Sequence, residues 1–307
     1  MRDAGCGLRA RQVGPDGAQS RSGLRPLQTR LEAASTTALT AVLLLSGCVM
    51  MGTKHMESTY VVKRAGERPA LDGNWDAPAW RSANTLRVER FMTAPGVSDH
   101  RPETQAKVLF ADDGLFVFFN VRDRYVVCRH TEFQSRVYQD SCAEFFVQPK
   151  PDKGYFNFEM NCGGALLVTY IEDATRTPEG FKKFTQLPPE MDALVKRFHS
   201  FTPAPRHPPL VPRPSSAAPR PSTLDTLALS PEVAGPLEWR LEYFIPFSFF
   251  ERYVGPLGNI SGQTWRANFF KCADASSHPH WATWSPLDSD FAGGFHRPDK
   301  FGVLRFE

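Results

Sequence analysis

The sequence is poor in the patterns that mark metal-binding, nucleic-acid-binding and membrane-spanning proteins. Its six cysteines form no Cys-x-x-Cys pair and no regular spacing with histidine, so nothing local predicts a zinc site. The formal net charge is only +3, and N-terminal arginines supply part of it, so the remaining chain is near neutral and has no basic patch for nucleic acid. The apolar run around Leu44 is too short for a transmembrane helix. With 307 residues and 41% hydrophobic content, the chain can still build a real core.

The N-terminal part has the features of an export signal. The apolar run Ala41-Val42-Leu43-Leu44-Leu45 is followed by Ser46-Gly47-Cys48, as a secretory h-region is followed by its cleavage site. The Leu-Ser-Gly-Cys ending is similar to a bacterial lipoprotein signal, in which the cysteine is lipidated and becomes the first mature residue. We therefore expect a leader at 1–48, lipidation of Cys48, a tether at 49–58, export to the cell envelope and membrane attachment through the lipid. Translation from Met56 would instead give a cytoplasmic protein.

Four cysteines remain after the leader. An even set fits two disulfides in an oxidising compartment, with three connectivities, and it equally fits four buried thiols. Cys142 and Cys162 flank a predicted hairpin and are the preferred pair, although strand alternation places them on opposite faces unless a bulge intervenes. The four residues are Cys128, Cys142, Cys162 and Cys272.

Apolar and polar residues alternate with a period of two through most of the chain after residue 58. This pattern is typical of half-buried strands, and Asp112-Asp113-Gly114 is a tight-turn sequence between two of them. Helical stretches are expected only at 76–83, 189–197 and 247–253. We predict an all-β, two-sheet antiparallel sandwich with a few short helices. The predicted strands are 59–65, 107–110, 115–121, 142–148, 155–161, 166–172, 239–246, 265–271 and 301–306.

The segment 201–222 differs sharply in composition from its surroundings. It is rich in proline, with serine, alanine and arginine between the prolines. Such a segment cannot bury apolar surface, so we expect an exposed, mobile insertion with polyproline II character. Strands on both sides are needed to close one sandwich, and we therefore assign 59–307 to a single domain.

Five segments, in order, resemble the family 9 carbohydrate-binding modules and their relatives. The first reads Leu71-Asp72-Gly73-Asn74-Trp75-Asp76-Ala77-Pro78-Ala79-Trp80, and the others lie at 115–123, 139–146, 239–247 and 298–306. The resemblance implies a β-sandwich of the jelly-roll or DOMON type that binds mono- or disaccharide units, often at the end of a polysaccharide. It also implies structural calcium as a cofactor, and a glycanase or a surface polysaccharide-utilisation machinery as partner.

Modules of this family clamp a sugar between two aromatic rings. One ring lies a few residues before the strand similar to 142–148, where this chain has Tyr138. The other precedes the C-terminal motif, where this chain has Phe295. Both are usually tryptophan in the family, so the smaller rings here offer less stacking area. Trp281 is a further candidate ring.

Strand geometry predicts the polar partners of the ligand. If Ala143, Phe145 and Val147 face the core, Glu144 faces the other way. The same argument places polar residues of the next strand and of the strand near the C-terminus on that face. Carboxylates, amides and a guanidinium together suit several sugar hydroxyls. The predicted set is Glu144, Asn157, Glu159, Arg266 and Asn268, with Asn161 on the same face.

Several alternatives remain open. Glu144 and Glu159 on neighbouring strands could act as the carboxylate pair of a glycoside hydrolase. His278 and His280 could bind a metal, and Met160 is the methionine best placed for a haem-binding relative of the sandwich. A surface scaffold that binds another protein is the last alternative. We interpret the chain as a non-catalytic carbohydrate-binding protein that supports carbohydrate catabolism.

Overall fold

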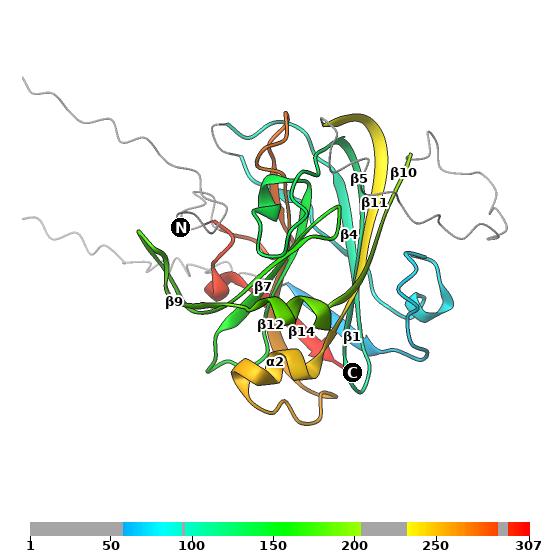
Figure 1. Cartoon of the computed structure of the whole chain (residues 1–307). Coiled ribbons are helices and arrows are strands. Elements are labelled where there is room, and N and C mark those ends of the chain that lie inside the picture. Colours follow the sequence, from blue (N-terminus) through cyan, green and yellow to red (C-terminus); the bar gives the residue numbers. More distant parts are fainter. Residues whose placement is uncertain (1–57, 94–95, 204–231, 288–293) are drawn as a thin grey trace, which may run out of the picture. The chain divides into compact units, whose positions relative to one another are not determined.

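The strands predicted from alternation form two layers in the computed structural model, which describes residues 58–93, 96–203, 232–287 and 294–307 (Figure 1). The expectations for the leader at 1–48, for Cys48, for nearly all of the tether and for most of the insertion at 201–222 concern residues outside this description. Among the described residues, no helix has the length and apolar character needed to cross a membrane.

The first layer, sheet A, contains the hairpin that was predicted at 142–161. Its strands run antiparallel to their neighbours except at β1, which pairs in parallel with β14. The short strands β13 (Trp281–Thr283) and β3 (Arg90–Phe91) extend it beside β12. In spatial order, sheet A consists of β1 (Thr59–Arg64), β14 (Gly302–Phe306), β12 (Thr264–Cys272), β6 (Cys142–Gln148), β7 (Tyr155–Asn161), β8 (Leu166–Thr177) and β9 (Gly180–Gln186).

The second layer, sheet B, contains the hairpin that turns at Asp112-Asp113-Gly114. Strand β1 belongs to both layers, because Thr59–Val62 pair with β14 whereas Lys63 and Arg64 pair in parallel with β4. This crossing strand corrects the expectation of a fully antiparallel sandwich. The order of sheet B is β10 (Lys196–Pro203), β11 (Val233–Pro246), β5 (Gly114–Val126), β4 (Glu103–Phe110) and β1, with β2 (Leu86–Arg87) beside β4.

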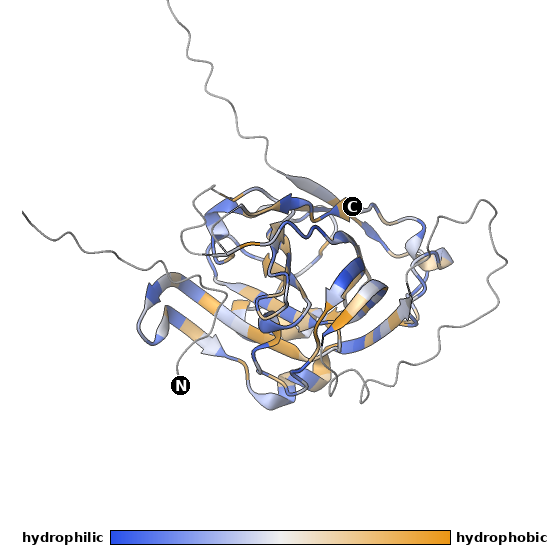
Figure 2. Ribbon diagram, turned by 90° about the horizontal axis from the view of Figure 1, so that it is seen from above, coloured by the Kyte–Doolittle hydropathy of each residue, from blue (hydrophilic) through white to orange (hydrophobic). Residues whose placement is uncertain are grey.

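Alternate residues of both sheets meet in one apolar core. Hydrophobic and hydrophilic residues alternate along the strands (Figure 2). Phe119 of β5 packs against Phe269 of β12 with ring centroids 6.0 Å apart, and Phe110 of β4 packs against Phe306 of β14 at 5.5 Å. Each such ring stabilises the sandwich by about 1.5–3 kcal/mol when it is fully buried. The predicted core residues of β6 and β7, including Phe145 and Met160, lie in this core.

The helices are shorter than the sequence predicts. The helix α2 (Phe247–Val254) matches the helix predicted at 247–253. The helices predicted at 76–83 and 189–197 are only the short 3₁₀ helices η1 (Pro78–Trp80) and η3 (Pro189–Leu194). After η3 the chain enters β10, where the backbone pairs with β11 instead of continuing a helix. Two more 3₁₀ helices, η2 (Val137–Gln139) and η4 (Pro298–Lys300), precede β6 and β14.

The expected Cys142–Cys162 disulfide is wrong. The Cys142 side chain lies on the outer face of sheet A, whereas Cys162 lies in the core between the sheets. Strand alternation separates them, and no bulge interrupts the β6–β7 register to bring them together. All four cysteines of the described chain are free and buried.

Candidate functional site

The outer face of sheet A carries three rows of side chains that run across neighbouring strands. Residues paired directly across an antiparallel ladder have Cβ atoms about 4.5–5.5 Å apart, so each row is a line of adjacent side chains. Glu144 and Glu159 are direct partners in this ladder, as the sequence predicts for one shared face. Across β12, β6 and β7, the rows read Asn268, Phe146 and Asn157; then Phe270, Glu144 and Glu159; then Cys272, Cys142 and Asn161.

Two of the predicted polar residues lie on this face but apart from the carboxylate pair. Arg266 precedes Phe270 by four residues, or roughly 14 Å of extended strand, and its guanidinium donates to the carbonyl of Phe301. Asn268 is fully engaged by the protein, because its Oδ1 accepts the backbone N–H of Ser285 at 2.8 Å and its Nδ2 donates to the Ser285 carbonyl at 3.1 Å. Arg266 and Asn268 therefore both bond to other parts of the protein.

The carboxylate pair is buried and incompletely hydrogen-bonded. Glu144 is 1% exposed and Glu159 3% exposed. Oε1 of Glu144 accepts the Cys272 thiol at 3.1 Å, and Oε1 of Glu159 accepts the Asn157 amide at 2.8 Å. The Oε2 atoms of both residues have no hydrogen-bond partner among the described residues. Burial is the main cause that raises the pKa of Glu159 to about 7 and the pKa of Glu144 well above its ordinary value.

A third buried glutamate shows that burial alone does not leave oxygens unpaired. Glu242 of β11 is as buried as Glu144, but its Oε1 accepts the indole N–H of Trp80 at 2.8 Å and its Oε2 accepts the backbone N–H of Gly73 at 2.7 Å. Both oxygens thus anchor the loop 71–80. A buried acceptor without a partner costs about 1–3 kcal/mol, so the free oxygens of Glu144 and Glu159 suit a ligand that supplies donors.

Aromatic rings cover the same face. The predicted rings Tyr138, Trp281 and Phe295 all belong to one apolar cluster there, together with Phe270. Phe295 stacks on Phe270 with centroids 4.1 Å apart and an interplanar angle of 17°. The face is thus neither a solvated surface nor an open platform, because rings and carboxylates are both buried in the structure.

Three further residues reach the site that sequence reasoning did not assign to it. The buried His296 places Nε2 4.0 Å from Oε1 of Glu159, and burial together with the charge of Arg176 holds the pKa of His296 well below its ordinary value. Asp274 accepts the indole N–H of Trp281 at 2.7 Å. The position of His296 next to Phe295 was a usable signal, whereas Arg176 lies on the part of β8 beyond the predicted strand.

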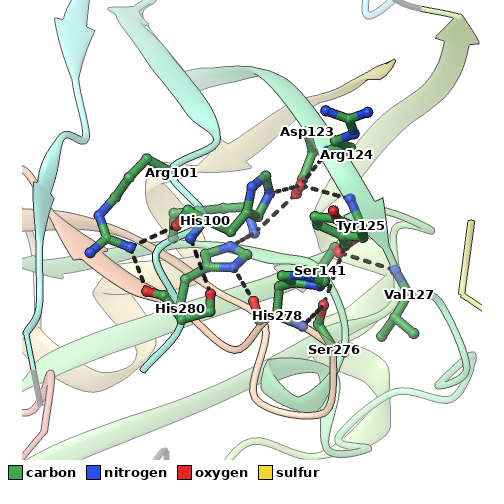
Figure 3. A network of polar contacts seen from close by, with 12 residues as sticks. His100, Arg101, Asp123, Arg124, Tyr125, Val127, Ser141, Ser276, His278 and His280 are labelled. Atoms are coloured by element: carbon green, nitrogen blue, oxygen red, sulfur yellow. Dashed lines mark hydrogen bonds and ion pairs between the residues drawn. The ribbon is translucent and has the colours of Figure 1, made fainter. Parts of the chain in front are cut away.

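A second polar cluster, at the end of the sandwich, corrects the metal interpretation of the histidines (Figure 3). Nε2 of His280 lies 2.8 Å from the Lys271 ammonium, and its Nδ1 lies 2.9 Å from the carbonyl of His278. Because both ring nitrogens are engaged, His280 has no nitrogen left for a metal. His278 stacks on Tyr125, with centroids 3.5 Å apart. These residues instead join β5 of sheet B to β12 of sheet A.

The candidate site lies on one sheet face of a two-layer β-sandwich. That face combines buried carboxylates, amides and aromatic rings, which are groups suited to a polar, ring-shaped ligand. The model of carbohydrate-binding family 9 matches residues 92–205 and 217–306. The chain therefore belongs to carbohydrate-binding family 9.

Solved structures are also similar to the chain. A proposed carbohydrate-binding protein from Bacteroides uniformis has 24% identity and a TM-score of 0.61, over 82% of this chain and 100% of that chain. Family 9 modules from Caldicellulosiruptor kristjanssonii, in complex with glucose and with cellotriose, each have 14% identity, with TM-scores of 0.45 and 0.44. They cover 81% of this chain and 96% and 94% of their own chains. No curated protein matches the chain.

Family membership decides between the alternatives. The chain is a carbohydrate-binding protein of a non-catalytic module family, and the glycoside hydrolase interpretation of Glu144 and Glu159 is set aside. Met160, the methionine considered for haem, packs in the core between the sheets.

Proposed function

We propose that the module binds a terminal sugar unit of an oligo- or polysaccharide on the outer face of sheet A. The unpaired Oε2 atoms of Glu144 and Glu159 carry this proposal, since a sugar hydroxyl can donate to each of them. Asn157 supports the Glu159 carboxylate from the neighbouring row. The rings of Tyr138 and Phe295, with Trp281 beside them, supply apolar surface for the sugar ring.

Burial of the site has a kinetic consequence. Because the rings and carboxylates are buried, a sugar has to displace part of the aromatic cover before it reaches Glu159. Arg176 is exposed and Asp274 half-buried, and both belong to the rim where a sugar would first meet the protein. Association that requires such rearrangement is slower than that of preformed surfaces.

Isothermal titration calorimetry with mono- and oligosaccharides tests the proposal. Glu159→Gln keeps an acceptor for Asn157 but replaces the unpaired Oε2 with an amide nitrogen, which cannot accept a hydrogen bond from a sugar hydroxyl. We expect affinity to fall by about 1.5–3 kcal/mol, or roughly 10- to 100-fold in Kd. Glu242→Gln is the matched control, because this equally buried glutamate lies on the other sheet. Folded Glu242→Gln protein should keep the wild-type affinity.

Two results would contradict the proposed site. Folded wild-type protein that releases no heat with any sugar would favour the protein-scaffold interpretation. Saturable binding that Glu159→Gln leaves unchanged would place the sugar elsewhere on the module.

We also propose that the protein is exported and anchored through a lipid on Cys48, near a glycanase or a surface polysaccharide-utilisation machinery. The signal-like sequence ending at Cys48 supports this. Labelling of cells with a radioactive fatty acid tests it: label on the wild type should be absent from Cys48→Ser. Equal label on both proteins would rule out lipid attachment at Cys48. A cytoplasmic location of the wild-type protein would favour translation from Met56.

A further inference from the structure

Three buried side chains with metal-ligand atoms meet where β6 pairs with β12. Cys142 and Cys272 are direct partners in this ladder, and Glu144 follows Cys142 by two residues on the same face. Their ligand atoms all lie within 4.8 Å of one another. The Cys272 Sγ lies 3.1 Å from Oε1 of Glu144. Two strands thus bring together donors that are 130 residues apart in the sequence, which is why no Cys-x-x-Cys motif marks them.

The spacing of these atoms suits a tetrahedral ion. Zinc bonds of about 2.3 Å to sulfur and about 2.0–2.2 Å to carboxylate oxygen place neighbouring ligands roughly 3.5–3.8 Å apart. The thiol-to-carboxylate distance of 3.1 Å and the 4.8 Å limit for the group bracket that value. The three ligand atoms are therefore close to the spacing of a tetrahedral site.

The three candidate ligands are buried together on the outer face of sheet A. Cys142 and Cys272 are fully buried, and Glu144 is nearly so. The Oε2 atom of Glu144, which the proposed sugar site also uses, has no hydrogen-bond partner among the described residues, and a bound cation would give this carboxylate a partner.

We propose that Cys142, Cys272 and Glu144 form a binding site for a thiophilic divalent cation, with Zn²⁺ as the expected ion. Sulfur donors select zinc over calcium, which takes oxygen ligands, so the structural calcium implied by the family resemblance does not fit this donor set. A three-ligand site leaves a fourth position for water. The ion would tie β6 to β12 and hold Glu144 in place within the proposed sugar site.

The proposal is separate from sugar binding, although Glu144 is common to both. Zinc content is measured without sugar, and Cys142 and Cys272 are not among the proposed sugar contacts. Failure of zinc binding would leave the sugar site standing, and failure of sugar binding would leave the zinc site standing.

The experiment uses the full chain, reduced and freed of metal. After addition of excess Zn²⁺ and gel filtration, elemental analysis should find one zinc per chain. Substitution of Co²⁺ should produce the near-ultraviolet charge-transfer band of thiolate ligation. Cys142→Ser and Cys272→Ser should weaken zinc binding by more than the roughly 10- to 100-fold lost when an outer-shell partner is removed. Cys162→Ala is the matched control, because that buried thiol lies in the core on the opposite face.

Several outcomes would overturn the site. Reduced, folded wild-type protein without zinc or a Co²⁺ thiolate band would do so, as would unchanged zinc content in the Cys142→Ser/Cys272→Ser double variant. If a serine variant does not fold, Glu144→Gln takes its place, and its zinc affinity should fall while the control retains the ion. A Cys142–Cys272 disulfide in mass spectra of unreduced protein, together with no zinc uptake after reduction, would also overturn the proposal.

Discussion

At the scale of single residues, Asp123 illustrates how a buried charge is held between the sheets. Its Oδ1 accepts the His100 ring N–H at 2.7 Å, and its Oδ2 lies 3.5 Å from the Lys271 ammonium. Both charged side chains are fully buried. Burial raises the pKa of Asp123, but the nearby Lys271 charge and the bond from His100 outweigh it and hold the pKa below its ordinary value.

Removal of this charge should be costly. Asp123→Asn leaves the Lys271 ammonium buried without its counter-ion, and we expect the free energy of unfolding to fall by about 3–5 kcal/mol. Asp112→Asn is the control, because its ion pair with Arg64 lies at the surface and contributes about 1 kcal/mol or less. Urea denaturation of both variants measures the difference. Equal, small effects would contradict the structural role of Asp123.

Alternation predicts the face of a residue, but not whether its polar atoms are satisfied. Glu144, Asn157 and Glu159 were placed on one face from sequence because strand periodicity is local. The amide of Asn268 lies on that face too, yet it is engaged by Ser285, which comes from a separate loop. Such partners depend on tertiary structure, so the sequence could not separate structural polar residues from free ones.

At the scale of elements, the loop 71–80 is anchored on sheet B by Gly73 and Glu242. Gly73 has φ of +72°, and its N–H donates to Glu242. A Cβ added there would lie 2.2 Å from Cε1 of Phe198 on β10. The position therefore demands glycine both for its backbone and for its close contact.

Gly73→Ala should lower the free energy of unfolding by about 1–3 kcal/mol, because it adds left-handed strain and a clash with Phe198. Gly66→Ala provides the comparison, since nothing lies within 4 Å of its added Cβ. Thermal or urea unfolding should separate the two. A Gly73→Ala protein as stable as Gly66→Ala would show that this loop is not tightly packed on sheet B.

Elements that local sequence defines are predictable, whereas elements held by contacts with distant segments of the chain are not. Strands β6 and β7 have the predicted bounds because a strong period of two and a turn-rich loop define them locally. Strand β10 was missed, because Lys196–Pro203 is held by pairing with β11, whose sequence lies beyond the proline-rich segment. The helix predicted at 189–197 ends with η3, because the residues after it pair with β11 as strand β10.

At the scale of the whole module, the sequence predicts a two-sheet sandwich but not the strand pairing that joins its two sheets. Alternating strands with short turns sufficed for two packed sheets. The parallel pairing of β1 with both β14 and β4 joins the N-terminal and C-terminal ends of the domain, and no local pattern encodes it. The same long-range assembly brings Phe295 over Phe270 and next to the carboxylates of β6 and β7.

The most direct test of the central claim is a crystal structure of the protein with the oligosaccharide that binds best in calorimetry. We predict a sugar ring on the outer face of sheet A, with hydroxyls within hydrogen-bond distance of Oε2 of Glu159 and the ring of Tyr138, Trp281 or Phe295 against it. A well-occupied sugar on sheet B or beside His278 and His280, with Glu159 still covered, would contradict this placement.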